Sequence, residues 1–245
     1  MISGKSAYDA RLPLYQRLRD EIVEKITTGE WRHDQPIPTE AELTKTYGIA
    51  VGTVRKAVDV LVAEGLLKRV QGRGTFVRRP NFNGLLFRFF RYQTGESEGK
   101  IPEGRVLTRT LETPPQHVVS ALGLSAKAKV IRLERLRLID GHVVLSEEIW
   151  LPKNRFAALL KVAPNDFDDL LYPFYESRCG QVVASAREIL TVESANAKVA
   201  QALDVEPGRP VVVIERLAFG FDRKPLEWRR SYGVADTFRY QIDIY

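Results

Sequence analysis

Cysteine is almost absent from this chain of 245 residues. Cys179 stands alone, so the chain can form neither an internal disulfide nor a cysteine zinc cluster. The only histidines, His33, His117 and His142, are too scattered to form a metal motif. We therefore expect neither a metal site nor a cofactor.

Long hydrophobic runs are also missing. The most apolar short stretch, residues 84–90, is interrupted by Arg88 and is too short to cross a bilayer. Residues 1–12 do not have the pattern of a secretory signal peptide. These absences predict a cytoplasmic protein that makes no membrane contact.

Charge is present but unevenly distributed. The net charge is +6, with 28% charged and 44% hydrophobic residues, which suits an ordinary globular protein with room for two modest domains. Residues 1–80 contain 14 Lys and Arg against 10 Asp and Glu, whereas residues 81–245 contain 23 against 21. The positive excess is therefore concentrated in the first third of the chain.

Residues 37–79 begin with the signals of a short helix and a tight turn. Thr39 and Glu42 have the spacing of a capping box, in which each side chain satisfies a backbone N–H of the other residue. Gly48 then supplies the backbone freedom that an interhelical turn requires. Upstream, Pro13 suits the first turn of a further helix, which we expect to end at Gly29.

A second helix is predicted to begin near Ala50 and to end at Gly65. Thr53, Arg55 and Lys56 lie outside its apolar stripe near its start, where a recognition helix contacts base edges and phosphates in the DNA major groove. The stripe recurs at helical spacing and consists of Val54, Ala57, Val58, Leu61 and Val62.

A basic β-hairpin follows. Residues 66–70 and 75–77 read as two strands joined by the tip Gln71, Gly72, Arg73 and Gly74. Residues 66–79 contain five Lys and Arg and no acidic residue, as expected for a wing that binds phosphate. Helix-turn-helix geometry is common, and each charge taken alone is usually a solvated surface residue. The complete order of elements, together with the local charge, favours DNA binding.

Five motifs of this module together indicate one family. They are Leu14-Tyr15-Gln16, Pro38-Thr39-Glu40, Thr53-Val54-Arg55-Lys56-Ala57, Glu64-Gly65-Leu66 and Gly72-Arg73-Gly74-Thr75-Phe76-Val77. With them, the module resembles the winged helix-turn-helix of the GntR family of bacterial transcription regulators. The resemblance implies that Thr39 contacts phosphate, that Thr53 and Arg55 act from the recognition helix, and that residues 72–75 enter a minor groove. With Lys56 and Gln71, the predicted DNA-binding residues are Thr39, Thr53, Arg55, Lys56, Gln71, Gly72, Arg73, Gly74 and Thr75.

Two positions depart from the family pattern. Ala50 and Val51 stand where the family usually has Ser followed by Arg. The missing Ser removes a helix N-cap, which is typically worth about 1 kcal/mol. The missing Arg removes a candidate guanine contact, worth roughly 1–3 kcal/mol of discrimination. The operator of relatives therefore cannot be assumed for this chain.

The rest of the chain contains a loose repeat. A short helix at 115–124 precedes two strands joined at Asp140-Gly141, and a helix at 193–205 precedes two strands joined at 222–225. Between the two copies we expect one or two helices at 154–179 and a strand at 182–191. Two helix-hairpin units predict an antiparallel α+β domain with internal pseudo-symmetry.

The first copy carries Arg135 and Arg137 on one apolar strand face, where a guanidinium must be paired. One interpretation is a structural salt bridge to Glu147 or Glu148 on the next strand. The other is a clamp for a small anionic ligand, for which planar guanidiniums are well shaped. Strand spacing alone leaves both open.

The second part of the chain contains a set of motifs that together indicate one family. They are Glu134-Arg135-Leu136-Arg137, Asp140-Gly141, Glu147, Trp150-Leu151-Pro152, Ala202-Leu203, Pro207-Gly208-Arg209-Pro210-Val211, Glu215-Arg216, Pro225-Leu226-Glu227 and Tyr232. With these motifs, residues from about 100 to 240 resemble the UTRA effector domain of the HutC subfamily of GntR regulators, which has the chorismate-lyase-like α+β fold. By resemblance, Arg135 and Arg137 hold an anionic group while Glu147, Glu227 and Tyr232 contact polar groups of the effector. The segment after Tyr232, residues 233–236, lacks the usual basic loop.

Together these features predict a winged helix-turn-helix domain at 1–79, a linker at 80–104 and a UTRA effector and dimerisation domain at 105–245. The expected function is that of a transcription regulator, a repressor that binds a palindromic DNA operator as a homodimer and responds to a small anionic metabolite. The alternative is a chorismate-lyase-like enzyme acting on an anionic substrate. It is disfavoured because no nucleophile and base pair is evident and because Glu147, beside two arginines, should be firmly ionised.

Overall fold

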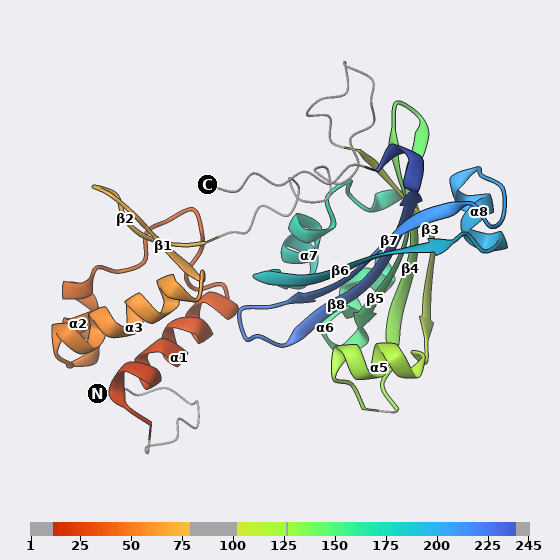
Figure 1. Cartoon of the computed structure of the whole chain (residues 1–245). Coiled ribbons are helices and arrows are strands. Elements are labelled where there is room, and N and C mark those ends of the chain that lie inside the picture. The colour runs from red at the N-terminus through yellow and green to blue at the C-terminus, as the bar shows by residue number, and fades with distance from the viewer. Residues whose placement is uncertain (1–11, 79–101, 126, 239–245) are drawn as a thin grey trace. The chain divides into compact units, whose positions relative to one another are not determined.

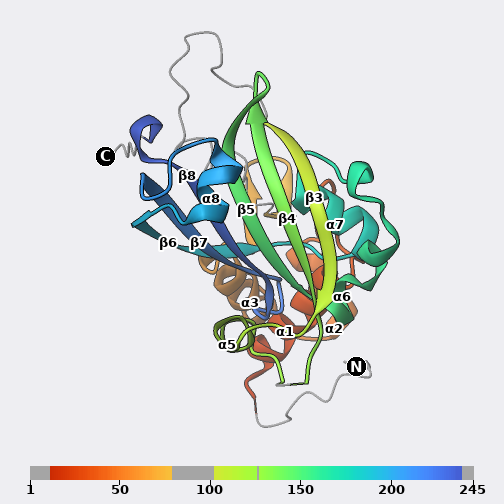
Figure 2. The ribbon, with the colours of Figure 1, turned by 90° about the vertical axis from the view of Figure 1, so that its right-hand side faces the viewer.

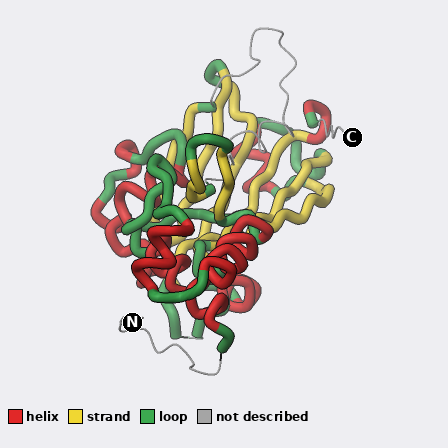
Figure 3. The backbone as a smooth tube through the Cα atoms, turned by 90° about the vertical axis from the view of Figure 1, so that its left-hand side faces the viewer, coloured by secondary structure: helices red, strands yellow, loops and turns green. Residues whose placement is uncertain are grey.

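The computed structural model describes residues 12–78, 102–125 and 127–238. The chain divides into two compact units, Met1–Pro80 and Asn81–Tyr245. Helices dominate the first unit and strands the second (Figure 3). Among the described residues, no helix is both long and apolar enough to cross a membrane.

The described part of the first unit, residues 12–78, has three helices and a two-stranded hairpin (Figure 1). Pro13 is the N-cap of the first helix, and glycines with positive φ follow the helices, including Gly48 at +65° and Gly65 at +72°. The buried core includes Leu18 and Ile22 from the first helix and Leu61 from the third. The elements are α1 (Leu14–Thr27), α2 (Glu40–Tyr47), α3 (Val51–Ala63), β1 (Leu67–Val70) and β2 (Gly74–Val77).

The second unit is built on a six-stranded antiparallel sheet with the order β3-β4-β5-β8-β7-β6. The predicted repeat is visible in this order, because the two halves meet where β5 pairs with β8. The antiparallel α+β class predicted from the sequence is thus confirmed. The strands are β3 (Glu103–Glu112), β4 (Val130–Ile139), β5 (His142–Pro152), β6 (Ser185–Ser194), β7 (Pro210–Phe219) and β8 (Pro225–Val234).

Helices cover both faces of this sheet (Figures 1 and 2). On one face lie α5 (Gln116–Leu122), which packs on Trp150 and Trp228, and α8 (Ala197–Leu203), which packs on Val211 and Val213. The other face is covered by α6 (Lys153–Phe156), α7 (Leu171–Cys179) and the 3-10 turns η1 (Ala157–Lys161) and η2 (Pro164–Asp166). A third 3-10 turn, η3 (Ala235–Thr237), follows β8.

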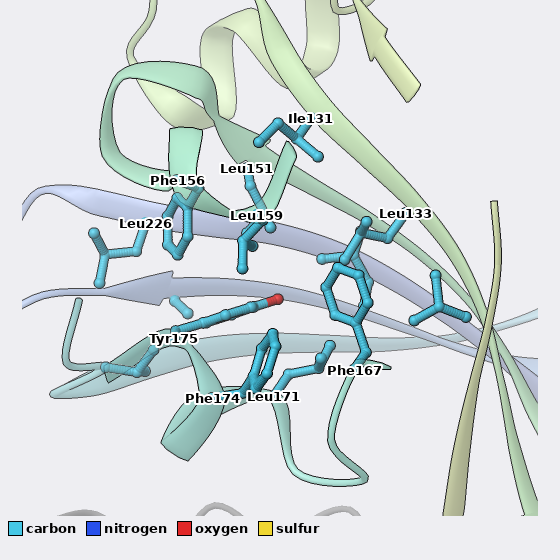
Figure 4. Packing of buried hydrophobic residues seen from close by; sticks show 14 residues of the cluster. Ile131, Leu133, Leu151, Phe156, Leu159, Phe167, Leu171, Phe174, Tyr175 and Leu226 are labelled. Atoms are coloured by element: carbon cyan, nitrogen blue, oxygen red, sulfur yellow. The ribbon is translucent and has the colours of Figure 1, made fainter. Parts of the chain in front are cut away.

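A large hydrophobic cluster lies between the sheet and α7. Phe156, Phe174 and Tyr175 pack there against Ile131 and Leu151 (Figure 4). The segment 154–179, expected to hold one or two helices, contains the short α6, the two 3-10 turns and α7. Most of the expected linker, residues 80–101, lies outside the described residues, and β3 begins at Glu103, inside the range assigned to it.

Candidate functional site

The start of α2 is held by the capping box that the sequence predicts. The Thr39 N–H donates to Glu42 Oε2 at 2.8 Å, and the Glu42 N–H donates to Thr39 Oγ1 at 3.3 Å. The hydrogen bond from the Thr39 backbone lowers the pKa of Glu42. By contrast, Ala50 caps α3 with no side-chain hydrogen bond, and the Val51 side chain is 49% exposed.

Glu40 connects the two helices with the hairpin. Its carboxylate accepts from Arg55 Nε of α3 at 3.0 Å and from Arg69 of β1 at 3.3 Å. The Arg55 side chain remains 61% exposed. Lys56 lies over the Tyr15 ring of α1, with its ammonium 4.1 Å from the ring centroid. Arg55 and Lys56 are both exposed, so both are available to a ligand from solvent.

The hairpin has the form of a wing that is held along β2 by residues 36 and 37. The Ile37 N–H donates to the Thr75 carbonyl at 2.8 Å, and Pro36 forms a bridge with Phe76. Gly72 and Gly74 adopt positive φ of +71° and +110°, which fits the predicted flexible tip. Arg73, between them, is exposed, with its guanidinium 5.9 Å from the Phe76 ring.

The nine residues predicted to contact DNA all lie in this first unit. Thr53 and Thr75 are half-buried, and the other seven are exposed. A solvent-accessible set of hydroxyls, guanidiniums and glycine backbone on a helix start and a hairpin tip can bind phosphate and base edges.

The second candidate site is a cluster of buried arginines on the sheet face that α7 covers. Four guanidiniums lie there, each almost completely removed from solvent. Arg135 is 1% exposed and Arg137 is 5% exposed on β4, Arg216 is 2% exposed on β7, and Arg229 is 4% exposed on β8. We call these residues and their carboxylate partners the arginine cluster.

Glu147 is one of two completely buried carboxylates in the cluster. It accepts from Arg135 Nη1 at 3.3 Å, from Arg229 Nη1 at 3.0 Å and from Ser231 Oγ at 3.4 Å. Although burial alone would raise its pKa, Arg229 and Arg135 lower it to about 2. Glu147 is therefore ionised at neutral pH and cannot serve as a proton donor.

Glu227 is the second buried carboxylate. Arg229 donates to both of its oxygens, at 3.0 Å from Nε and 2.8 Å from Nη2, in a bidentate pair. Tyr172 and Tyr175 of the α7 segment donate to it at 3.1 Å and 2.9 Å. Burial and the Glu227 charge raise the pKa of Tyr172 to about 12, so its hydroxyl stays protonated as a donor.

Among the described residues buried on this face, positive charge exceeds negative charge, since four guanidiniums accompany two fully buried carboxylates. Glu188, which binds Arg216 Nε at 2.6 Å, has a side chain 22% exposed, and Asp169 is exposed at the rim. Burial lowers the pKa of Arg137 to about 10, which means that the charged form is disfavoured there. An added anion would relieve this imbalance.

A loop carbonyl lies against the arginine pair. The Asp169 carbonyl oxygen accepts from Arg135 Nη2 and from Arg137 Nη1, both at 2.6 Å. Gly104 of β3 makes room for the first guanidinium, because a Cβ at that position would lie 1.8 Å from Arg135 Nη2. The structure is therefore closed over the two arginines, and a ligand must displace part of this cover.

The structure brings together four of the five residues predicted to contact an effector, Arg135, Arg137, Glu147 and Glu227. It does not bring Tyr232 to them. Tyr232 lies on the opposite face of the sheet, packed against the α8 cluster. Side chains alternate between faces along a strand, so Glu227, Arg229 and Ser231 share one face and Tyr232 has the other.

The salt-bridge interpretation holds for one of its two candidate partners, Glu147, and not for Glu148. Arg135 pairs with Glu147 directly across the two strands, whereas Glu148 points to the other face and lies 3.4 Å from Arg132. A structural ion pair and an anion clamp are compatible, because Glu147 engages Arg135 through Nη1 while Nη2 faces the loop. The prediction omitted two arginines of the cluster, Arg216 and Arg229. It also omitted the hydroxyl groups of Ser231, Tyr172 and Tyr175, which donate to the buried carboxylates. Two-residue periodicity from Glu227 could have identified Arg229 and Ser231.

In the described part of the chain, no group of three or more His, Cys, Asp or Glu residues is placed so that it could hold a metal ion. Cys179 is partly buried, which raises the pKa of its thiol. It therefore stays largely a thiol, not a reactive thiolate.

Known proteins resemble both units. Residues 14–77 match the family described as bacterial regulatory proteins, gntR family, and residues 97–239 match the UTRA domain. The HTH-type transcriptional repressor NagR of Bacillus subtilis is 26% identical over 230 residues, which cover 94% of this chain and 93% of NagR.

Solved structures share the fold. The ligand-binding domain of a protein described as a GntR-family transcriptional regulator, from Bordetella bronchiseptica, is 27% identical with a TM-score of 0.59, and the match covers 69% of this chain and 100% of that domain. PhnF from Mycobacterium smegmatis is 23% identical with a TM-score of 0.54, and the match covers 95% of this chain and 99% of PhnF.

Proposed function

The chain belongs to the gntR family of bacterial regulatory proteins and carries a UTRA domain, and on this premise we propose a repressor that binds a palindromic operator as a homodimer and is released by a small anionic metabolite. It is a regulator of transcription and not an enzyme, as relatives such as the repressor NagR indicate. A protein with this task works where the bacterial DNA is, in the cytoplasm.

The excess of buried guanidiniums is the observation that supports an anionic effector. Arg137 is a buried cation whose pKa is lowered by burial, and Arg135 shares an acceptor oxygen with it. A carboxylate or phosphate group placed against these two residues would form charge-assisted hydrogen bonds, which are roughly twice as strong as neutral ones. Glu227 and the two tyrosine hydroxyls would then orient polar groups of the same ligand.

The exposed start of α3 and the wing support DNA binding in this proposal. Arg55 and Thr53 would contact the major groove, and Arg73 at the glycine-rich tip would contact the backbone or a minor groove. Thr39 would bind phosphate at the start of α2. Because Ala50 and Val51 replace the usual Ser and Arg, the operator has to be determined for this protein.

Effector and operator binding would be coupled reciprocally. If the effector weakens operator binding by some factor, the operator weakens effector binding by the same factor. The domain division 1–79, 80–104 and 105–245 assigns DNA binding to the first part and effector binding and dimerisation to the last.

The effector class can be tested by a thermal-shift panel of sugar phosphates, carboxylates and amino-acid catabolites on the full chain. A ligand that binds only the folded state raises the melting temperature, by an amount set by its concentration relative to its Kd. We expect an anionic compound to stabilise the wild type, and we expect the effect to disappear in Arg137→Gln. Stabilisation by neutral compounds alone would contradict the proposal.

The DNA half is tested separately by gel shift with DNA flanking the protein's own gene. We expect a complex that weakens when the stabilising anion is added. A tight complex that no bound anion alters would leave DNA binding intact and refute effector control.

A further inference from the structure

Asp169 makes contacts in two directions from the loop before α7. Its carbonyl oxygen accepts from Arg135 and Arg137, each at 2.6 Å. Its side chain turns to β3, where Oδ1 accepts from the Gly104 N–H at 2.6 Å. One residue thus connects the arginine pair with the start of the sheet.

The carbonyl occupies a position that suits an anionic oxygen better. Two guanidiniums converge on this single acceptor, and the Asp168 carbonyl adds only a longer contact of 3.4 Å to Arg135. Glu147 pairs with Arg135, but the carbonyl is neutral and adds no negative charge to the two guanidiniums. An oxygen of a carboxylate or phosphate would add that charge, so it should displace the carbonyl from Arg135 and Arg137.

Gly104 is the second residue of β3, which is the first described element after the β1–β2 hairpin of the first unit. It also has no room for a side chain, because Arg135 Nη2 fills the space. Gly104, Arg135 and Asp169 therefore form a closed set of contacts.

We propose that Asp169 is the positioning residue through which effector occupancy reaches β3, an inference that rests on the anion site proposed above. In the ligand-free chain its carbonyl stands in for the effector's acid group and its carboxylate holds the Gly104 N–H. An anion on Arg135 and Arg137 displaces the carbonyl, moves residue 169 and releases Gly104 at the end of the segment that leads from the DNA-binding unit.

Hydrogen exchange at the Gly104 amide tests this directly in the full chain. Asp169→Ala removes the acceptor but keeps the backbone carbonyl, and Asp169→Asn is the matched control that keeps Oδ1. Without ligand, we expect exchange at Gly104 to be about tenfold faster or more in Asp169→Ala than in the wild type, and close to wild type in Asp169→Asn. The Leu133 amide of β4 should not change.

Inorganic phosphate and acetate serve as probes for the two acid groups. Saturating amounts of the one that binds should accelerate Gly104 exchange in the wild type toward the Asp169→Ala rate, and should leave exchange in Asp169→Ala unchanged. Its thermal stabilisation should be kept in Asp169→Ala and lost in Arg137→Gln.

The experiments distinguish a failure of the role proposed for Asp169 from a failure of the proposed anion site. If an anion stabilises the wild type through Arg137 but Gly104 exchange does not respond, the role of Asp169 is wrong and the anion site stands. If Asp169→Ala leaves Gly104 exchange unaltered, the role of Asp169 is again refuted. If neither probe stabilises the wild type at any concentration tested, the anion site fails and this inference fails with it.

Discussion

Replacing Glu147 by Gln is the most informative perturbation of the arginine cluster. Glu147 is 2% exposed and accepts from Arg135, Arg229 and Ser231. Glutamine has nearly the same size and keeps one acceptor, but it removes a negative charge from among four buried guanidiniums. Breaking a buried ion pair by removing one partner costs about 3–5 kcal/mol, because the remaining charge stays buried.

This loss of unfolding free energy can be measured as a decrease in the melting temperature. For a unit of this size, 1 kcal/mol corresponds to about 2–4 °C, so Glu147→Gln should melt roughly 6–20 °C below the wild type. Glu148→Gln is the matched control, since the neighbouring residue lies on the opposite face with its side chain 31% exposed and pairs with Arg132 at 3.4 Å. That partly exposed pair should contribute less than about 1 kcal/mol.

Thermal unfolding at neutral pH, followed by circular dichroism with and without phosphate, is the assay. Because an anion restores the missing charge, phosphate should stabilise Glu147→Gln more than the wild type. The reasoning is refuted if Glu147→Gln and Glu148→Gln melt alike, or if phosphate stabilises the variant less than the wild type.

Three further outcomes follow from the described contacts. The folded-state pKa of Glu147 is lowered from 4.5 to about 2. Its contribution to the free energy of unfolding is therefore complete above about pH 4.5 and is lost as the pH falls toward 2. An acid titration of stability should show this loss in the wild type and not in Glu147→Gln. Arg73→Ala should weaken DNA binding and reduce the slope of log Kd against log salt by about 0.9, whereas the exposed Arg105→Ala should do neither. Ala50→Ser supplies the missing cap of α3 and should raise the unfolding free energy of the first unit by about 1 kcal/mol in a denaturant titration, while an unchanged midpoint would show that the cap is not formed.

The first unit was largely predictable because its signals are local. The Thr39 capping box, Gly48 and the apolar stripe of α3 each act within a few residues, and the structure reproduces all three. The repeat in the second unit was predictable for the same reason. Each half of the sheet corresponds to a helix and a hairpin that recur in the sequence with similar spacing.

The arginine cluster was only partly predictable because it is assembled across long sequence separations. Tyr175 meets Glu227 from 52 residues away, and Arg229 meets Glu147 from 82. No local pattern indicates such contacts. Tyr232 is different, since strand alternation from Glu227 already assigns it to the opposite face of the sheet, in conflict with the role that the family resemblance implies.

The central claim is that an anion in the arginine cluster controls DNA binding, and fluorescence anisotropy on labelled DNA from beside the protein's own gene tests it most directly. Wild type and Arg137→Gln should bind the DNA equally in the absence of effector. The anion identified by thermal shift should raise the Kd for DNA in the wild type, by the same factor by which DNA raises the Kd for that anion, and should have no effect on Arg137→Gln. Equal responses of the two proteins, or a wild-type Kd that does not change at saturating anion, would contradict the account.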